Sequence, residues 1–247
     1  MRLRSAAMRF PGRELAGLLP AALPSDDARQ TLADRYIELE VGRTEGAPWR
    51  VLDLGCGPGT SVDFFRARDP SVQWVGLDLP DSPEVRMRSR SDARFETFDG
   101  VTIPFEEKSF DLVYCKQVLE HVRRPAPLLA EVNRVLAPGG FFAGSTSQLE
   151  PFHSVSLWNY TPLGFAQLAE DAGLTVLEVR PGIDALALIA YRLLGRRRIF
   201  DRWFGRRSPL NWAIDAYGRA RRLSPSAINA TKLVFCGQFA FLARSAQ

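Results

Sequence analysis

The segment VLDLGCGPGT, residues 51–60, constrains the fold of this chain more than any other stretch. Val51–Leu54 suits a buried strand, and glycines then occupy positions 55, 57 and 59. Glycine lets the backbone turn sharply and approach a ligand without a side-chain clash. A helix that follows such a turn presents free N–H groups at its start. The sequence therefore predicts a site for a nucleotide-like or carboxylate-bearing ligand after this strand.

Short apolar runs alternate with helical patterns from Arg50 onward, which predicts a parallel sheet with helices on both faces. Right-handed crossovers would bring the loops after the strands to one edge, where such folds bind ligands. The predicted strands are Arg50–Leu54, Gln73–Leu77, Ala93–Phe98, Phe110–Cys115, Phe141–Ser145, Leu174–Val179 and Leu233–Leu242. The predicted helices between them are Thr60–Arg68, Pro127–Val135 and Thr161–Ala172.

An N-terminal helical segment, residues 1–47, is expected to precede a ligand-binding domain over residues 48–247. Residues 1–24 contain three prolines and predict irregular chain with one short helix. Ser25 followed by Asp26 and Asp27 is typical of a helix start, so we expect a helix from there to about Gly42.

Length and composition favour one domain in a reducing compartment. The chain has 247 residues and no run near the roughly 18 apolar residues of a membrane span. Arg9, Arg13 and Glu14 interrupt any apolar core of a secretion signal. The three cysteines are widely spaced, which argues against a disulfide framework or a zinc site. We expect a cytoplasmic protein without a bound metal.

The glycine spacing excludes two common phosphate-binding motifs. The third glycine comes one position too early for G-x-G-x-x-G, with Thr60 in its place. No Lys-Ser or Lys-Thr pair follows, as a P-loop requires. Asp53, beside the turn, would repel a pyrophosphate and attract a cation.

Five motifs in order resemble those of class I S-adenosylmethionine-dependent methyltransferases. They are VLDLGCGPGT, WVGLDLPD, FDGVTIPF, SFDLVYCKQVLEHV and RVLAPGGFFAGST. Each motif is weak alone, but the ordered set at this spacing is specific. The resemblance covers roughly residues 48–182 and resumes over 232–243. It implies a Rossmann-like α/β fold with a mostly parallel seven-stranded sheet, an antiparallel last strand and a helical insertion before that strand.

The same resemblance implies the residues that bind S-adenosylmethionine. Gly55 and Gly57, with Cys56 between them, would approach the methionine and ribose, and Asp53 would help to hold the ammonium group. Asp78 would take the ribose hydroxyls, and Leu79 would pack on the adenine. Asp99 and the backbone of Gly100 would read the adenine edge, and the backbone at Lys116 would face the ammonium group. Without the resemblance, a structural role as a loop or capping residue is favoured for each acid, and packing is favoured for Cys56.

The two histidines of the chain are the candidate catalytic residues. His121 lies in LEHV after the fourth strand, and His153 lies in LEPFHSVSLWNY after the fifth. We expect His153 to be the general base, with a loop hydrogen bond as the alternative. A structural role is favoured for His121, and Glu120 and Tyr160 are weaker candidates for the base. The segment around His153 resembles the acceptor loop of methyltransferases that act in sugar and polysaccharide assembly.

A basic insertion, residues 185–229, separates the last two predicted strands and is too long for a plain loop. Residues 185–247 contain twelve Arg or Lys and two Asp, so the remainder of the chain is net acidic. We expect two or three helices there, rich in Arg, Trp and Phe. Three interpretations stay open for 185–222: peripheral contact with an anionic membrane at its inner face, a lid over an anionic acceptor, or a solvated cap.

The favoured function is methyl transfer to a hydroxyl of a sugar, nucleotide sugar or lipid-linked glycan, with S-adenosylhomocysteine as product. One alternative is a methyltransferase of a natural-product phenol, quinone or amine. Another is a non-catalytic scaffold that binds S-adenosylmethionine. We expect no nucleic-acid partner, because the chain lacks N-P-P-[YF], a Pro-Cys pair and any recognised nucleic-acid-binding module.

Overall fold

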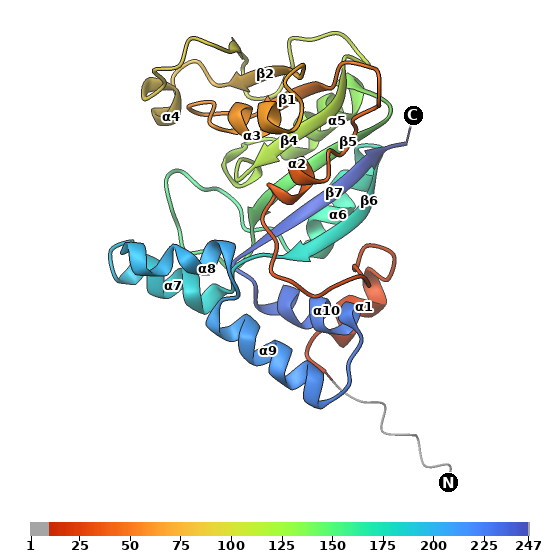
Figure 1. Ribbon diagram of the computed structural model, residues 1–247, viewed down its shortest axis with the longest axis vertical. Helices are drawn as coiled ribbons and strands as arrows, with labels where there is room; N and C mark the ends of the chain where they lie inside the picture. The colour runs from red at the N-terminus through yellow and green to blue at the C-terminus, as the bar shows by residue number, and fades with distance from the viewer. Residues whose placement is uncertain (1–9, 247) are drawn as a thin grey trace.

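The computed structural model describes residues 10–246, which form one seven-stranded sheet of order β3-β2-β1-β4-β5-β7-β6. β7 runs antiparallel to both of its neighbours, and the other pairs are parallel. The fold predicted for the chain is confirmed (Figure 1). The strands are β1 Arg50–Leu54, β2 Gln73–Asp78, β3 Arg94–Thr97, β4 Phe110–Lys116, β5 Leu136–Ser147, β6 Leu174–Pro181 and β7 Gln238–Ser245.

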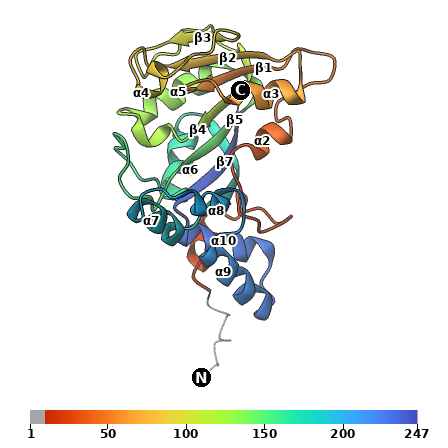
Figure 2. The same ribbon diagram turned by 60° about the vertical axis from the view of Figure 1, so that its left-hand side comes forward.

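Helices cover both faces of this sheet (Figure 2). The α-helices are α1 Arg13–Leu18, α2 Arg35–Glu38, α3 Ser61–Arg68, α4 Pro83–Arg86, α5 Pro125–Val135, α6 Pro162–Asp171, α7 Ala185–Leu193, α8 Arg202–Gly205, α9 Pro209–Ala220 and α10 Pro225–Phe235. Two 3-10 helices, η1 Leu119–His121 and η2 Arg198–Phe200, complete the set within the described range.

The alternation of side chains along β1 divides the core into two clusters. Leu52 and Leu54 pack with α5 and α6 on one face, while Val51 packs with Phe65 of α3 on the other. Successive residues of a strand point to opposite faces, so a strand buried on both faces reads as a continuous apolar run. Asp53 points to the same face as Val51. It is the last residue but one of β1, a buried strand, so its carboxylate lies in the interior.

Packing, more than helix propensity, stabilises the short helices. α6 is ten residues long, below the length at which isolated helices are stable in water. Phe165 of α6 is fully buried, with its ring centroid 4.3 Å from that of Phe241 on β7. Burying a side chain of this size contributes about 1.5–3 kcal/mol. Thr161 caps the helix, its side chain accepting a hydrogen bond from the N–H of Gly164 at 3.0 Å.

The helix predicted from Ser25 to Gly42 is wrong over most of its length, because only Arg35–Glu38 is helical. Asp26 and Asp27 do not cap a helix. Their carboxylates pair with the guanidinium of Arg180, which is 2% exposed and needs anionic partners. The N–H of Thr31 donates to the carbonyl of Pro181 at 2.8 Å. Long-range contacts therefore hold residues 26–31 in a non-helical conformation against β6.

The strand predicted over Leu233–Leu242 begins too early, since its first residues belong to α10. Ser224 and Pro225 are a helix start that the sequence interpretation overlooked: Ser224 accepts a hydrogen bond from the N–H of Ala227 at 3.3 Å. The insertion contains α7 to α10 and is more helical than expected. Lys232, fully buried, pairs with Asp215 of α9 and so ties the last helices together.

Candidate functional site

The glycine turn after β1 has the backbone conformation that the sequence predicts. Gly55, Gly57 and Gly59 have φ angles of +71°, +52° and +80°, which residues with a Cβ atom rarely adopt. A Cβ atom on Gly55 would also lie 2.3 Å from Cγ2 of Val118. Glycine is therefore needed at position 55 both for its φ angle and for the close approach of the loop after β4.

Two buried carboxylates end the neighbouring strands β1 and β2. Asp53 is 4% exposed and Asp78 is 8% exposed. Asp78 accepts hydrogen bonds of 2.7 Å from the N–H groups of Gly57 and Leu79, which fixes the glycine turn to β2. Neither acid takes part in an ion pair within residues 10–246. Buried carboxylates without a cationic partner are suited to a ligand that brings a positive charge and hydroxyl donors.

Burial raises the pKa of Asp53 to about 7. The hydroxyl of Ser61 donates a hydrogen bond to its carboxylate and, with the charge of Lys116, partly opposes this shift. Asp53 therefore changes its protonation state near neutral pH, where a bound cation would favour the ionised form.

The segment between β2 and β3 holds the glycine turn from outside. Arg88 donates to the carbonyl of Gly57 at 2.7 Å, and Arg90 donates to that of Gly59 at 2.9 Å. The same Arg88 lies 3.4 Å from the sulfur of Cys56. Burial raises the pKa of Cys56 well above its usual range, so its thiol stays protonated and is not suited to act as a nucleophile.

Asp99 and Gly100 form a turn beside Leu79. The carboxylate of Asp99 is exposed and accepts hydrogen bonds from the N–H groups of Val101 and Thr102, which lower its pKa. A Cβ atom on Gly100 would lie 3.3 Å from Cδ2 of Leu79. The structure thus brings Leu79 and Gly100 together at the carboxyl ends of β2 and β3. The carboxylate of Asp99 also stabilises its own turn by accepting these hydrogen bonds.

Lys116, at the carboxyl end of β4, directs its side chain to the N-terminal segment. Its Nζ lies 2.7 Å from Oδ1 of Asp34, which also accepts a hydrogen bond from the hydroxyl of Tyr114 at 2.8 Å. The sequence interpretation did not single out Asp34, and no local motif marks it. The predicted role of Lys116 concerns its backbone and stays a prediction.

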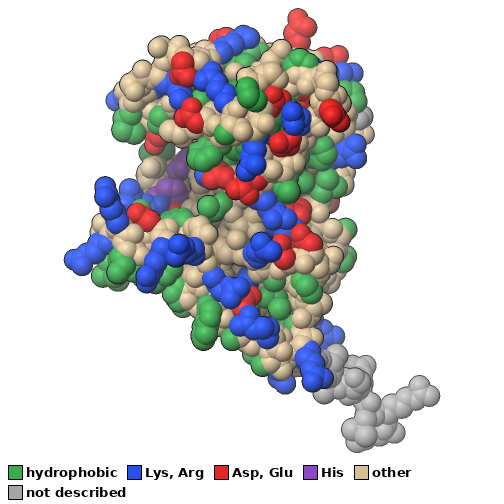
Figure 3. Space-filling view, viewed as in Figure 1, with side chains coloured by type: hydrophobic (Ala, Val, Ile, Leu, Met, Phe, Trp, Pro, Cys, Tyr) green, Lys and Arg blue, Asp and Glu red, His purple; other side chains and the backbone are tan. Residues whose placement is uncertain are grey.

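His121 and His153 come from different elements and meet edge to face, with ring centroids 5.2 Å apart. Burial is the main cause that lowers the pKa of His121, and the neighbouring His153 adds to it. Nδ1 of His121 is buried and has no hydrogen-bond partner among residues 10–246. Figure 3 shows the histidine side chains in a hollow above α7 and α8, with Lys and Arg side chains along its rim. The pair therefore lies where an acceptor could reach it.

Glu120, beside this pair, is fully buried, and burial raises its pKa to about 7. Its carboxylate accepts a hydrogen bond from Thr146 at 3.0 Å, and its Oε1 lies 3.1 Å from the hydroxyl oxygen of Ser147. Glu120, His121 and His153 each offer one atom that could ligate a metal, and these three atoms lie within 4.8 Å of one another. The sequence interpretation did not foresee this cluster. These three atoms could hold a metal ion, and the two imidazoles and the carboxyl group could also exchange protons.

Tyr160 is not suited to be the base. Its hydroxyl donates to the carbonyl of Leu119 at 3.1 Å, and burial raises its pKa further above the usual range. The sequence interpretation also missed Glu150, which contacts His153, and Arg192, which binds Glu150. Glu150 lies three residues before His153, which was the one available signal.

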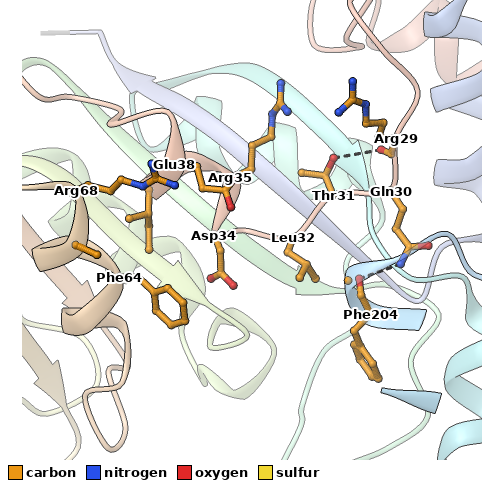
Figure 4. Close-up of a pocket in the computed structure, with 13 residues that line it drawn as sticks. Arg29, Gln30, Thr31, Leu32, Asp34, Arg35, Glu38, Phe64, Arg68 and Phe204 are labelled. Carbon is orange, nitrogen blue, oxygen red and sulfur yellow. Dashed lines mark hydrogen bonds between the residues drawn. The ribbon is translucent and has the colours of Figure 1, made fainter. Parts of the chain in front are cut away.

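A pocket of about 520 Å³ lies elsewhere, between residues 29–38, α3 and the end of α8 (Figure 4). Asp34, the partner of Lys116, lies in its wall. Neither the glycine turn nor the histidine pair lines this pocket. We place the candidate site at the strand ends, because the buried carboxylates lie at the ends of β1 and β2 and the histidines follow β4 and β5 at the same edge of the sheet.

The chain is similar to methyltransferases among known proteins. Residues 52–144 match the family model described as a methyltransferase domain, the Methyltransf_11 family. A trans-aconitate 2-methyltransferase of Variovorax paradoxus is 37% identical over 95 residues, which cover 38% of this chain and 37% of that protein. An uncharacterised 37.1 kDa protein in a transposon of Streptomyces fradiae is 40% identical over 140 residues, 53% of this chain and 41% of that protein. The chain thus spans about two fifths of the length of these curated relatives.

Solved structures share the fold at low sequence identity. A structure described as a putative sarcosine dimethylglycine methyltransferase from Galdieria sulphuraria superposes with a TM-score of 0.58 at 18% identity, covering 87% of this chain and 85% of that one. At this identity the likeness concerns the fold alone. The shared fold is the seven-stranded mixed sheet with its antiparallel last strand.

Proposed function

Since this chain contains a class I S-adenosylmethionine-dependent methyltransferase domain, we propose that it transfers the methyl group of S-adenosylmethionine to a hydroxyl oxygen of a small-molecule acceptor. One observation carries the proposal. Asp53 and Asp78, both buried and without ion-pair partners in the described chain, flank a glycine turn, and the histidine pair follows β4 and β5 at the same edge of the sheet. A cationic nucleoside suits the two carboxylates and the glycine turn, and a hydroxyl acceptor suits the histidine pair.

The residues at the strand ends suit the parts of the cofactor. Asp53 and the backbone of Gly55 would hold its methionine ammonium, with the backbone at Lys116 on the opposite side. Asp78 would accept hydrogen bonds from the ribose hydroxyls, because each of its oxygens has a lone pair left after binding Gly57 and Leu79. Leu79, Asp99 and Gly100 would form the adenine side.

When bound, S-adenosylmethionine supplies a methyl carbon whose bond to sulfur breaks with the electron pair left on sulfur, giving S-adenosylhomocysteine. The residues of this chain then have two tasks. They hold the acceptor oxygen in line with that carbon. His153 takes the hydroxyl proton on its ring nitrogen as the new bond forms. His121 shapes the site beside it.

A polar or anionic acceptor, such as a sugar, nucleotide sugar or lipid-linked glycan, is our first proposal. The group around His153 is polar, with Glu120 and Glu150 both buried, and arginines lie on the nearby insertion. The name trans-aconitate 2-methyltransferase, borne by a relative, also indicates an anionic small acceptor for that protein. A natural-product phenol, quinone or amine is the alternative acceptor, and a site with more apolar walls would favour it.

A binding protein without turnover is the other class to separate. One solved structure with this fold is described as a [4+2]-cyclase, at 19% identity and a TM-score of 0.55. The fold therefore does not by itself imply methyl transfer. The open hollow beside the histidines favours an enzyme with access for an acceptor (Figure 3).

Titration calorimetry of the purified chain with S-adenosylmethionine and with S-adenosylhomocysteine is the first test. We expect dissociation constants in the micromolar range for both. The next step is to measure S-adenosylhomocysteine formed with a panel of sugars, nucleotide sugars, trans-aconitate and phenols. Absence of binding of either nucleoside would overturn the proposed function. Binding without turnover on any class of acceptor would favour the scaffold.

Affinity for S-adenosylmethionine is expected to rise with pH through about 7, because Asp53 must be ionised to hold the ammonium group. Below that pH the buried carboxyl is protonated and binding must first release the proton. Each pH unit below 7 then costs up to about tenfold in affinity. Calorimetry between pH 6 and 8 measures this. Asp53→Asn should bind more weakly and show a flat profile, and a wild-type affinity independent of pH would contradict the role of Asp53.

Peripheral contact with an anionic membrane is proposed for the insertion. Leu186, Ile189 and Leu193 lie on one face of α7 and are exposed. Arg196, Arg197 and Arg198 follow, all exposed and without an ion pair within residues 10–246. Exposed apolar side chains beside arginines suit the interface of a bilayer with anionic lipids. None of the helices of residues 10–246 has the length and apolar character to traverse a bilayer.

Arg197→Gln combined with Arg198→Gln is expected to weaken binding to vesicles of phosphatidylcholine and phosphatidylglycerol about thirtyfold, at about 1 kcal/mol per arginine near the surface. Sedimentation of the protein with such vesicles measures the effect. Vesicles of phosphatidylcholine alone are one control. The pair Arg66→Gln and Arg94→Gln is another: Arg66 of α3 pairs with Asp92, and Arg94 begins β3, the edge strand opposite β6. Equal binding to both kinds of vesicle would exclude a preference for anionic lipids, and no binding to either would exclude the membrane role. A cytoplasmic location at the inner face agrees with the three cysteines, which are buried and free of disulfides.

A further inference from the structure

Glu150 is the most densely bonded acid beside the histidine pair. Its side chain is 1% exposed. It accepts hydrogen bonds from Ser147 at 2.8 Å, Gln238 of β7 at 2.7 Å and Arg192 of α7 at 2.6 Å. Its Oε1, the atom that contacts Arg192, also lies 3.5 Å from Nδ1 of His153. One buried carboxylate thus connects the sheet, the basic insertion and His153.

The surroundings of His153 determine which ring nitrogen carries the proton in the neutral imidazole. Nδ1 faces the carbonyl of Pro151 at 3.3 Å and the carboxylate of Glu150. Both are acceptors, so Nδ1 must be the donor. Nε2 then has the lone pair and is the atom able to take a proton. A carboxylate that fixes the tautomer of a histidine base is a known way to keep it in its working form.

Arg192 brings the insertion into this arrangement. It lies in the last turn of α7, and its side chain is 20% exposed while that of Glu150 is buried. Its Nε is buried and has no hydrogen-bond partner among residues 10–246. The N–H group at Nη2 is therefore the donor that binds the guanidinium to Glu150. A charge-assisted hydrogen bond of this length is stronger than one between neutral groups. Glu150 would otherwise be a buried carboxylate without a cationic partner.

We propose that Glu150 and Arg192 are positioning residues: Arg192 of α7 fixes Glu150, and Glu150 keeps the proton of neutral His153 on Nδ1, so that Nε2 is free to act as base. This inference rests on the proposed role of His153. It gives α7 a part in the methyl transfer itself, in addition to any contact with a membrane or an acceptor. The groups that face His153 in this arrangement are His121, Glu120 and Glu150, with Arg192 behind Glu150.

Nitrogen NMR of the full chain labelled with ¹⁵N-histidine tests the proposal, because the chain has only two histidines. His121→Asn assigns the signals. In the wild-type protein at alkaline pH we expect His153 to be mainly in the Nδ1–H form. Glu150→Ala should shift the tautomer ratio about tenfold towards Nε2–H, the change expected when one hydrogen bond to a charged group is lost. Arg192→Met should shift it in the same direction by about threefold, since Glu150 remains but is no longer held.

Two arginine variants serve as controls. Arg192→Lys keeps the charge and should retain most of the wild-type ratio, and Arg196→Met, an exposed arginine of the same insertion, should leave it unchanged. Melting curves show whether Glu150→Ala folds, and Arg192→Met carries the test if it does not. An unchanged ratio in both variants, or a wild-type His153 mainly in the Nε2–H form, would overturn the proposal. The affinity for S-adenosylmethionine should be the same in all four variants, so a failure of cofactor binding would be recognised separately.

Discussion

Asp78→Ala is expected to weaken binding of S-adenosylmethionine about a hundredfold. The substitution removes the proposed acceptor of two ribose hydroxyls, and hydrogen bonds to a charged group contribute about 1.5–3 kcal/mol each. It also releases the N–H of Gly57, which Asp78 holds at 2.7 Å. The glycine turn then loses its tie to β2. Titration calorimetry with S-adenosylmethionine measures the dissociation constants of both proteins.

Asp81→Ala is the matched control, since this acid lies three residues further along the same loop with a side chain that is 75% exposed. We expect its affinity to stay within about twofold of the wild type, because its ion pair with Arg86 lies at the surface. If both alanine variants bound equally well, Asp78 would not be the ribose acceptor, and the position of the nucleoside would have to be reconsidered.

His153→Asn is expected to lower turnover on a hydroxyl acceptor by a factor of about 10²–10³, the contribution typical of a general base. Its affinity for S-adenosylmethionine should not change, since His153 lies on the acceptor side of the site. Formation of S-adenosylhomocysteine at saturating nucleoside measures the effect. His121→Asn provides the comparison and should cost less, because it shapes the site without taking the proton.

The nature of the acceptor decides how this result is interpreted. A carboxylate acceptor is already ionised at neutral pH and needs no base. Loss of activity with sugars in His153→Asn would support the proposed mechanism. Full activity of this variant with a hydroxyl acceptor would contradict it, and full activity with trans-aconitate alone would direct the search to carboxylates.

The sequence predicted the site best where local chemistry determines the structure. Gly55 and Gly57 require a positive φ, and Asp78 ends a short strand, so motif and geometry coincide. The predicted helix from Ser25 failed because its signal was local, whereas Asp26 and Asp27 bind Arg180 far along the chain. Glu150 and Arg192 were missed for the same reason. Their meeting depends on where α7 lies relative to the loop after β5, which no short motif encodes.

The position of β7 has a consequence for how this chain emerges from the ribosome. β6 pairs only with β7, which is inserted between β5 and β6 although it is made after both. While α7 to α10 are being synthesised, β6 has no strand partner. The edge of β5 that later pairs with β7 is also unpaired during this time. Such unpaired edges are templates for association with other chains. The nascent protein therefore passes through a long interval in which it depends on chaperones or on rapid helix packing to avoid aggregation, and that interval ends only when the last strand closes the sheet.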